Sequence, residues 1–433
     1  SPTHSSQHDG GGFGSRLTWR APQLQGAARA RVGGAARATM SMRRAARAVY
    51  MAGQGQVAVT RNKGATLSAM GSDAINAALV DAGMDKDRPT ALFVGNMMSG
   101  MLSSQQHLGP YLCHAVGLGH IESSTVEACC GAGGAAIRAG YMAIASGLHD
   151  TVIVSGVEAM THADPADTTK ALATASHWPT EGGLGQTFVS LNAHLMAIYM
   201  DEYKVPHRDF APFAITAHNN AATNPTAVFS KKAVSVDDFE NAATLVEPVQ
   251  LFDACPTCDG AAAVILTADK DAARRADGTV VRVAGSGAAT DVLPVIERPA
   301  PLHLTAVQIS TEQALGEAAM DRADVDIVEL HDAYSIMACL CLEAAGFAPP
   351  GGGVAHAQAG EIDLSGSTPI ATFGGLKARG HPVGATGVYQ AAEAFLQLVG
   401  AAGANQVAEA QTALVQNIGG AGSSVFTHAL VRE

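Results

Sequence analysis

The chain has 433 residues, a formal net charge of −12, 47% hydrophobic residues and only 15% charged residues. These values predict a compact globular protein with a large core and room for two domains, and they exclude an intrinsically disordered chain. The excess of acidic residues argues against nucleic acid as a partner. No apolar run approaches the roughly 20 residues that a membrane-spanning helix needs.

The first 46 residues differ in composition from the rest of the chain. Arginines are spread among Ala, Gly and Ser, and no acidic residue follows Asp9 in this segment. That composition is typical of an organellar transit peptide and favours a mitochondrial location. The alternative is an over-extended translation with the true start at Met40 or Met42, which leaves a cytoplasmic or peroxisomal location open. The C-terminal Val-Arg-Glu is not a peroxisomal address of the Ser-Lys-Leu kind. Residues 1–46 are therefore excluded from the predicted fold as a disordered or transit-like segment.

The folded part begins with a predicted strand at Ala48–Val59. Its phrase Val49–Gly55 returns in related form at Val281–Gly287. The residues after each copy also match, because Ile75–Asn96 and Thr311–Asp332 both have the pattern of a helix, a turn and a strand. The spacing of the two copies is far too long for a solenoid, so the repeat indicates a duplicated domain.

Each half then continues with a Gly-rich loop, a helix and a β-branched strand. In the first half the strand is Thr151–Met160; in the second half the helix is Val388–Val399 and the strand is Thr412–Gly420. Alternating strands and helices predict an α/β fold with two duplicated βαβ-rich halves, whose parallel-rich mixed sheets pack in layers with helices. The predicted halves span residues 47–275 and 276–433.

A long stretch inside the first half, residues 161–248, breaks this pattern and predicts an inserted loop domain. It contains two helix-like runs, Phe188–Tyr203 and Phe210–Asn224, surrounded by turn residues. Insertions of this length usually act as lids or binding elements. Three cations in it could meet a phosphate group, and a solvated surface is the competing interpretation: Arg208, Lys231 and Lys232.

The seven cysteines are an odd number, which in a chain of this size is typical of reduced thiols. Cys255 and Cys258 form a CxxC motif, but no second pair follows at zinc spacing, so no metal site is predicted. Cys339 and Cys341 lie in a helix-like run and are expected in the core.

Cys130 is the candidate nucleophile, because it stands just before a small-residue helix start. A thiol at a helix N-terminus is expected to have a lowered pKa. Cys129 is adjacent but cannot face the same crevice. The glycines after Cys130, among them Gly133, leave room for a substrate and for backbone N–H donors. A buried cysteine with no chemical role is the alternative for either residue.

Two histidines lie on comparable loops. His381 stands in the Gly-rich stretch Gly374–Gly387, directly before Pro382 and a predicted helix, and His331 comes after the predicted strand DIVEL. Asn417, in the sequence QNIGGAG with Gly419, ends the last long strand and could offer an amide. Ligands of α/β sheets gather near carboxyl ends of strands, so the Cys130 and His381 loops are expected to meet at one crevice. A phosphate cradle, a capping role or a core role remains open for each residue taken alone.

Several motifs together resemble the thiolase superfamily, and are most similar to its branch of sterol-carrier-protein thiolases and archaeal acetyl-CoA acetyltransferases. The resemblance runs from about Val49 to the C-terminus and rests on VEACCGAGG (Val126–Gly134), GVEAMT (Gly156–Thr161), NP (Asn224–Pro225), CDGAAAVIL (Cys258–Leu266), HDAY (His331–Tyr334), GGLKARGHPVGATG (Gly374–Gly387) and NIGG (Asn417–Gly420).

The resemblance implies roles for three residues. Cys130 matches the cysteine that is acylated by acyl-CoA, and His381 matches the histidine that activates that thiol. His331 takes the place where other thiolases have an asparagine that orders a water in an oxyanion hole. Two departures concern the second cysteine of the family: most thiolases carry it where this chain has Asn417, and sterol-carrier-protein thiolases carry it where this chain has Ala333. The Claisen step therefore lacks an evident base, for which His331 is a candidate.

The sequence thus predicts a thiolase-type acyl-CoA acyltransferase that works through a Cys130 thioester, in thiolysis or Claisen condensation of acetoacetyl-CoA or another 3-ketoacyl-CoA. Acyl-CoA and CoA are the expected partners, with CoA as substrate and product and no bound cofactor. The resemblance also implies a homodimer or a dimer of dimers. Acyl transfer to an acceptor other than CoA, and a non-catalytic CoA-binding or assembly subunit, are the alternatives.

Overall fold

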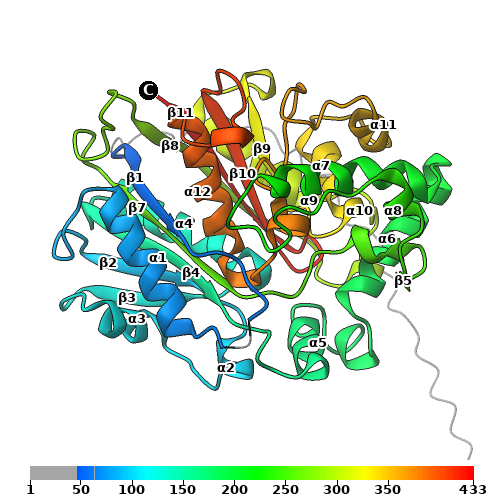
Figure 1. Cartoon of the computed structure of the whole chain (residues 1–433), viewed down its shortest axis with the longest axis horizontal. Coiled ribbons are helices and arrows are strands. Elements are labelled where there is room, and N and C mark those ends of the chain that lie inside the picture. Colours follow the sequence, from blue (N-terminus) through cyan, green and yellow to red (C-terminus); the bar gives the residue numbers. More distant parts are fainter. Residues whose placement is uncertain (1–45, 63) are drawn as a thin grey trace, which may run out of the picture. The chain divides into compact units, whose positions relative to one another are not determined.

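Two strands with related sequences, β1 (Val49–Gln56) and β8 (Val281–Thr290), are antiparallel neighbours in a nine-stranded sheet. They are seen in a computed structural model that describes residues 46–62 and 64–433 (Figure 1). Ala46–Glu433 form one compact unit. The sequence predicted a disordered or transit-like segment at residues 1–46. Of these, residues 1–45 lie outside the described residues.

The first half and its insertion contain these further elements: α1 (Leu67–Asp81), β2 (Ala91–Gly95), α2 (Ser99–Leu102), α3 (Leu108–Val116), β3 (Glu122–Val126), α4 (Ala132–Ala145), β4 (Thr151–Glu158), α5 (Pro165–Ala173), α6 (Phe188–Tyr203), α7 (Ala211–Ala222), α8 (Val236–Glu240), β5 (Thr244–Val246), β6 (Val249–Gln250) and β7 (Gly260–Thr267). The second half adds α9 (Thr305–Ala318), β9 (Ile327–Glu329), α10 (Ser335–Ala345), α11 (Gly353–Gln358), α12 (Thr386–Leu398), β10 (Thr412–Gly419) and β11 (Ser424–Arg432).

The order of the strands confirms the predicted duplication. The sheet runs β3-β2-β4-β7-β1-β8-β11-β10-β9. In the first half β1 pairs antiparallel with β7 and β7 with β4, and β4 pairs parallel with β2. In the second half β8 pairs antiparallel with β11 and β11 with β10, and β10 pairs parallel with β9. Among the described strands only three pairs are parallel, β2 with β3, β2 with β4, and β9 with β10, so the parallel share is smaller than the sequence predicted.

Helices α4 and α12 occupy equivalent positions in the two halves and pack against each other between strands of both halves (Figure 1). Their apolar residues form one core with strands of both halves, among them Ile137 on α4 and Phe395 on α12. A second core lies under α1 and α3, and a third joins α9 and α10 to α6 and α7 of the insertion. These layers match the predicted architecture.

Local sequence explains the main boundaries. Strands β2, β4 and β7 are buried along their whole length, which accounts for their nearly continuous apolar and small residues. Helix α6 begins where Thr187 and Ser190 cap each other through side chain and backbone. Strand β3 lies at the outer edge of the sheet and is partly exposed. Among the described helices, none has both the length and the apolar character that crossing a membrane requires.

Candidate active site

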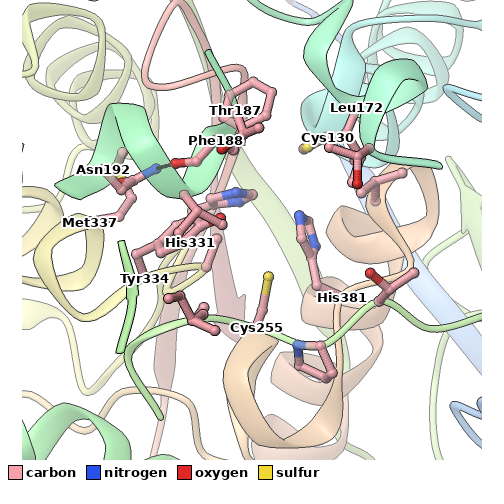
Figure 2. A pocket seen from close by; sticks show the side chains of 18 of the residues that line it. Cys130, Leu172, Thr187, Phe188, Asn192, Cys255, His331, Tyr334, Met337 and His381 are labelled. Atoms are coloured by element: carbon pink, nitrogen blue, oxygen red, sulfur yellow. Dashed lines mark hydrogen bonds between the residues drawn. The ribbon is translucent and has the colours of Figure 1, made fainter. Parts of the chain in front are cut away.

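A cavity of about 220 Å³ brings together the residues that the sequence singled out from the two halves. Cys130, His331 and His381 all line it, and Figure 2 shows their side chains directed toward the same space. The inserted domain supplies part of the wall through apolar and polar residues of α5 and α6, including Leu172, Phe188 and Asn192. The predicted meeting of the two Gly-rich loops is therefore confirmed.

Cys130 lies in a single 3₁₀ turn, Cys129–Gly131, that runs directly into α4. Cys129 has a positive φ of 53°, and its backbone N–H donates to Glu127 Oε1 at 2.6 Å. Of the two adjacent cysteines, Cys130 alone lines the cavity. This turn thus places Cys130, and not Cys129, in the cavity.

The expected lowering of the pKa of Cys130 is wrong. Burial raises the pKa of the Cys130 thiol well above its ordinary value, and the charge of Glu158 adds to the effect. The backbone contribution at the helix start acts in the opposite direction but is smaller. Because desolvation outweighs the helix terminus here, Cys130 rests as a thiol and needs a base to become a nucleophile.

The start of α4 is fixed by neutral side chains from the second half. Asn417 Oδ1 accepts the backbone N–H of Gly134 at 2.9 Å, and a ring nitrogen of His428 lies 3.0 Å from the Gly134 carbonyl oxygen. Asn417 is fully buried and is not among the residues that line the cavity. Its amide therefore holds the nucleophile helix in place rather than facing the substrate directly.

His331 has a defined tautomer. Its Nδ1 lies 3.3 Å from the backbone nitrogen of Ile418, which can only donate, and 3.5 Å from Asn417 Nδ2. Nδ1 is therefore an acceptor, and the ring proton is on Nε2. Burial lowers the pKa of His331 to about 3, so the ring stays neutral. A neutral imidazole with its N–H free suits a hydrogen-bond donor to an oxyanion.

His381 lies between a π-helical turn, Gly375–Arg379, and the start of α12. Its Nδ1 is 2.7 Å from Thr386 Oγ1, which fixes the ring while leaving Nε2 without a protein hydrogen bond among the described residues. Burial lowers the pKa of His381 well below its usual range, and the neighbouring His331 and Arg379 reinforce the effect. The two imidazoles have ring centroids 5.1 Å apart and are nearly perpendicular, at 87°. A neutral His381 can accept the proton of a nearby thiol.

Buried charges fasten the His381 loop to the second half. Arg379 pairs with Glu393 on α12 at 3.0 Å, and both side chains are almost wholly excluded from solvent. The guanidinium also lies 4.6 Å from the ring centre of Tyr389. Lys377 Nζ is 3.2 Å from Ser335 Oγ at the start of α10. Such groups are stable in the interior only with their partners, so they fix the loop in one arrangement.

Glu158, at the end of β4, connects the segment after β2 with the His381 loop. Its carboxylate accepts the backbone N–H groups of Met97, Met98 and Gly384, the last of which belongs to the His381 loop. Burial raises the pKa of Glu158 to about 7, although these hydrogen bonds oppose the shift. Glu158 therefore links β4 to the loop before α12 while contributing less negative charge near Cys130 than an exposed glutamate would.

The two glycines that were predicted to position substrate have a packing role. A Cβ on Gly133 would lie 2.8 Å from the backbone nitrogen of Gly387, and one on Gly419 would lie 2.3 Å from the carbonyl oxygen of Ala128. Both distances are too short for a side chain. Neither glycine lines the cavity, whereas Gly420 does. Gly133 lets α4 approach the start of α12 closely, and Gly419 lets the end of β10 approach the segment before Cys130.

The three cations that the sequence offered for a phosphate group, such as those of CoA, lie outside the lining of the cavity. Lys231 and Lys232 are exposed on the inserted domain, and Lys232 Nζ lies over the ring of Phe252 at 5.7 Å. Arg208 pairs with Glu240 at 3.2 Å on the surface.

Cys339 and Cys341 are buried in α10, as predicted. In the part of the chain that the structure describes, no cluster of His, Cys, Asp and Glu is arranged to hold a metal.

Sequence reasoning missed two residues of the cavity. Cys255 was considered only as a zinc ligand, yet it lines the cavity beside the two histidines (Figure 2). Asn192 projects from α6, and its buried Oδ1 has no hydrogen-bond partner among the described residues. The signal for Cys255 was its place shortly before β7, just ahead of the motif Cys258–Leu266 that supports the family resemblance. No sequence signal distinguished Asn192 from other polar helix residues.

Comparison with known proteins identifies the family. Residues 48–270 match the thiolase N-terminal domain, and residues 287–432 match the thiolase C-terminal domain-like family. An acetyl-CoA acetyltransferase of Methanothermobacter thermautotrophicus is 39% identical over 355 residues, which are 82% of this chain and 92% of that protein. Sterol carrier protein 2 of Oryctolagus cuniculus is 28% identical over 344 residues, which are 72% of this chain and 59% of that protein.

A solved structure described as an "Ltp2-ChsH2(DUF35) aldolase" has the same fold. It superimposes with a TM-score of 0.78, covers 89% of this chain and 97% of its own, and is 21% identical in sequence. The family matches span both halves of the fold and include the loops of Cys130, His331 and His381. The predicted family is confirmed: the chain belongs to the thiolase family and is an acyltransferase of the thiolase type.

Proposed function

We propose that this thiolase-family protein transfers an acetyl group between CoA thioesters through a thioester on Cys130, with acetyl-CoA and acetoacetyl-CoA as substrates. The observation that carries the proposal is the single cavity that joins Cys130 to a neutral base and to a neutral hydrogen-bond donor. The modest volume of about 220 Å³ favours a short acyl group. CoA enters as substrate and product, and no bound cofactor is required.

The first half-reaction begins with transfer of the Cys130 proton to His381. In condensation the thiolate attacks the thioester carbonyl of acetyl-CoA, and in thiolysis it attacks the 3-keto carbonyl of acetoacetyl-CoA. In each case the carbonyl oxygen becomes an oxyanion. His331, whose proton is on Nε2, donates a hydrogen bond to that oxygen. Collapse of the tetrahedral intermediate leaves acetyl-Cys130. It releases the CoA thiolate in condensation and the Cα carbanion of acetyl-CoA in thiolysis, and this leaving group must then be protonated. The raised pKa of Cys130 makes this dependence on His381 strong.

The second half-reaction transfers the acyl group to a nucleophile. In thiolysis the nucleophile is the thiol of CoA, and in condensation it is the enolate carbon of acetyl-CoA. Either attack regenerates an oxyanion at the same carbonyl, so the same donor serves again. Cys130 then leaves and regains its proton from His381.

We also propose that the protein is a homodimer. Strand β3 supports this, because it ends the sheet with a partly exposed edge and carries exposed residues at Glu122 and Thr125. An unpaired sheet edge is a ready site for strand pairing with a second copy. Light scattering after size-exclusion chromatography tests it: a monomeric mass across micromolar concentrations would reject the dimer.

The test of the proposed reaction is CoA-dependent cleavage of acetoacetyl-CoA into two molecules of acetyl-CoA. The wild type is expected to turn over, and Cys130→Ser is expected to be inactive because a serine hydroxyl is far less acidic than a thiol. Acylation of Cys130 without cleavage would assign the transfer to an acceptor other than CoA. A protein that shows neither acylation nor cleavage would instead be a CoA-binding or assembly subunit.

A further inference from the structure

The proposed reaction needs a proton at a position that the two histidines do not supply. Thiolysis of acetoacetyl-CoA breaks a carbon–carbon bond and leaves an electron pair on Cα of the departing acetyl-CoA, and that carbon must be protonated. Condensation needs the reverse, removal of a proton from the methyl group of acetyl-CoA. One group of this chain must carry that proton, and its assignment below rests on the proposed function.

His331 cannot act as a base in the arrangement observed. Its Nδ1 accepts from the backbone N–H of Ile418, so its Nε2 already carries the proton. His381 is occupied with the proton of Cys130 in both half-reactions. The two positions at which other thiolases carry a second cysteine offer no ionisable group here, because residue 333 is alanine and Asn417 bears an amide.

Two ionisable side chains remain among the residues that line the cavity, Cys255 and Tyr334. In Figure 2 the sulfur of Cys255 points upward into the space between the imidazoles of His331 and His381. Cys255 is partly buried and lines the cavity. Cys258, the other cysteine of the motif, is completely buried and does not line the cavity.

The backbone holds Cys255 in this position. Its N–H donates to the carbonyl oxygen of Ala333 at 2.9 Å, and Ala254 forms an antiparallel bridge with Tyr334. The segment of Cys255 is therefore paired with the segment that comes after His331. Because both sides of this pairing line the cavity, the thiol keeps a fixed relation to the oxyanion donor.

We propose that Cys255 is the acid and base that protonates and deprotonates Cα. In thiolysis the Cys255 thiol donates its proton to the Cα carbanion, and acetyl-CoA departs. The resulting Cys255 thiolate takes the proton of the incoming CoA thiol. The CoA sulfur attacks acyl-Cys130, a new thioester forms, and Cys130 leaves as a thiolate that is reprotonated by His381. Condensation takes the same steps in reverse, so protons and electrons balance without another reactant.

The charges around Cys255 suit both states of the thiol. Burial and the carboxylate of Asp332 raise its pKa, which keeps the resting group protonated for its role as an acid. The buried ammonium of Lys377 acts in the opposite direction and stabilises the thiolate once it forms. Cys130, Cys258 and Tyr334 also feel the charge of Cys255, which agrees with its place at the centre of the site.

Tyr334 is the competing group. Burial raises the pKa of its hydroxyl, and the nearby Cys255 and Cys130 raise it further. A phenol begins from an ordinary pKa near 10 and a thiol from about 8.5. No cation appears among the groups that shift the pKa of Tyr334, whereas Lys377 favours the thiolate of Cys255. The thiol is thus the better acid and the better-stabilised base.

Exchange of the methyl protons of acetyl-CoA with deuterated water reports the Cα step directly. Mass spectrometry measures deuterium in the acetyl group, and the same samples report acetylation of the Cys130 peptide. In Cys255→Ala and Cys255→Ser we expect Cys130 to be acetylated, which shows that the site is folded. We expect exchange and acetoacetyl-CoA turnover to fall by about 10²–10⁴-fold, the usual contribution of a positioned acid or base.

Cys113→Ala is the matched control, because Cys113 is a buried thiol of α3 in a separate core and does not line the cavity. It is expected to exchange like the wild type. Wild-type exchange in both Cys255 variants would overturn the proposal, and so would loss of exchange in Tyr334→Phe with exchange kept in Cys255→Ala. A wild type that never acetylates Cys130 would overturn the proposed function, and the role of Cys255 with it.

Discussion

The Cys130 loop and the His381 loop occupy equivalent places in the two halves, each directly before a helix of the central layer, yet they are held in opposite ways. Hydrogen bonds to the backbone fix the first: Asn417 and His428 bond to Gly134, and Glu127 accepts the N–H of Cys129. Buried charges fix the second, above all Arg379 with Glu393. The two halves therefore share the geometry of their loops but differ in the residues that hold each loop in place.

This difference reflects the side chain that each loop carries. Charges near Cys130 act directly on its pKa, as the charge of Glu158 does, because the site is desolvated. The His381 loop can tolerate charges because its imidazole is itself kept neutral by burial, and the charged groups lie on the side of α12 and α10. We infer that the nucleophile is positioned by small residues and hydrogen bonds, and its base by an anchored loop.

The largest effects are expected from the two histidines, which test whether His381 acts as the base and His331 as the oxyanion donor. His381→Ala should slow acylation of Cys130 by about 10²–10⁴-fold, since the thiol loses its base. His331→Ala should slow it by about 10²–10³-fold, since an oxyanion loses a donor. Rapid-quench measurement of acyl-Cys130 gives both rates, and His331→Gln, which restores an N–H donor, is expected to recover part of the loss.

The pH dependence separates these roles further. Because burial lowers the pKa of His381, the base stays neutral on acidification, and wild-type acylation should hold its rate down to at least about pH 6.5, the ordinary histidine pKa. It should decline only as the pH falls through the lower pKa of the buried ring. A rate that already halves near pH 7 would contradict this environment for His381.

The next effect concerns the anchoring of the His381 loop. Glu393→Ala leaves the guanidinium of Arg379 buried without its carboxylate, which should cost about 3–5 kcal/mol in the free energy of unfolding. Glu240→Ala removes the partner of the surface residue Arg208 and should cost at most about 1 kcal/mol. Urea denaturation compares the two variants. Equal losses would show that the buried pair does not anchor the loop.

A smaller effect is expected where the two equivalent helices meet. Gly133→Ala places a Cβ 2.8 Å from the backbone of Gly387 and should destabilise the protein by about 1–3 kcal/mol, with slower acylation because α4 must shift. Gly316→Ala on α9 meets no atom within 4 Å and should be neutral or stabilise by up to about 1 kcal/mol. Thermal unfolding distinguishes them, and an unchanged Gly133→Ala would argue against close helix contact.

The smallest effect concerns the exposed lysines of the inserted domain. We propose that Lys231 and Lys232 attract the phosphates of CoA, so their joint change to alanine should raise KM for acetyl-CoA by less than about tenfold, as expected for exposed charges worth up to roughly 1 kcal/mol, without changing kcat. Lys204→Ala removes an exposed lysine of the same domain that pairs with Asp201 and is the control. An equal KM in both variants would reject a role for the pair.

Much of the fold could be predicted from the sequence because the repeat and the Gly-rich loops are local signals. The run Phe188–Tyr203 was predicted as a helix and is α6, and Cys130, which was preferred over Cys129, lines the cavity. Whether the strand pairs are parallel or antiparallel was less predictable, because β7 and β11 pair antiparallel with strands that are distant in the sequence. The pKa of Cys130 was also missed, because desolvation depends on residues distant in the chain.

Cys255 shows the same limit within the site. Its motif suggested a metal ligand, and only the pairing of its segment with Ala333 and Tyr334 brings the thiol beside His331. Asn417 shows the converse, because its strand-end position predicted contact with substrate while its amide is directed to Gly134. Local sequence placed these residues near the site, and tertiary pairing decided which way they face.

The central claim is that Cys130, activated by a histidine from the other half, carries the acyl group. The most direct measurement is the mass of the Cys130 peptide after brief incubation with acetyl-CoA and acid quenching. The account predicts one added acetyl group on Cys130 in the wild type, and its loss on addition of CoA. An unmodified Cys130, or an acetyl group on Cys129 or Cys255 instead, would contradict it.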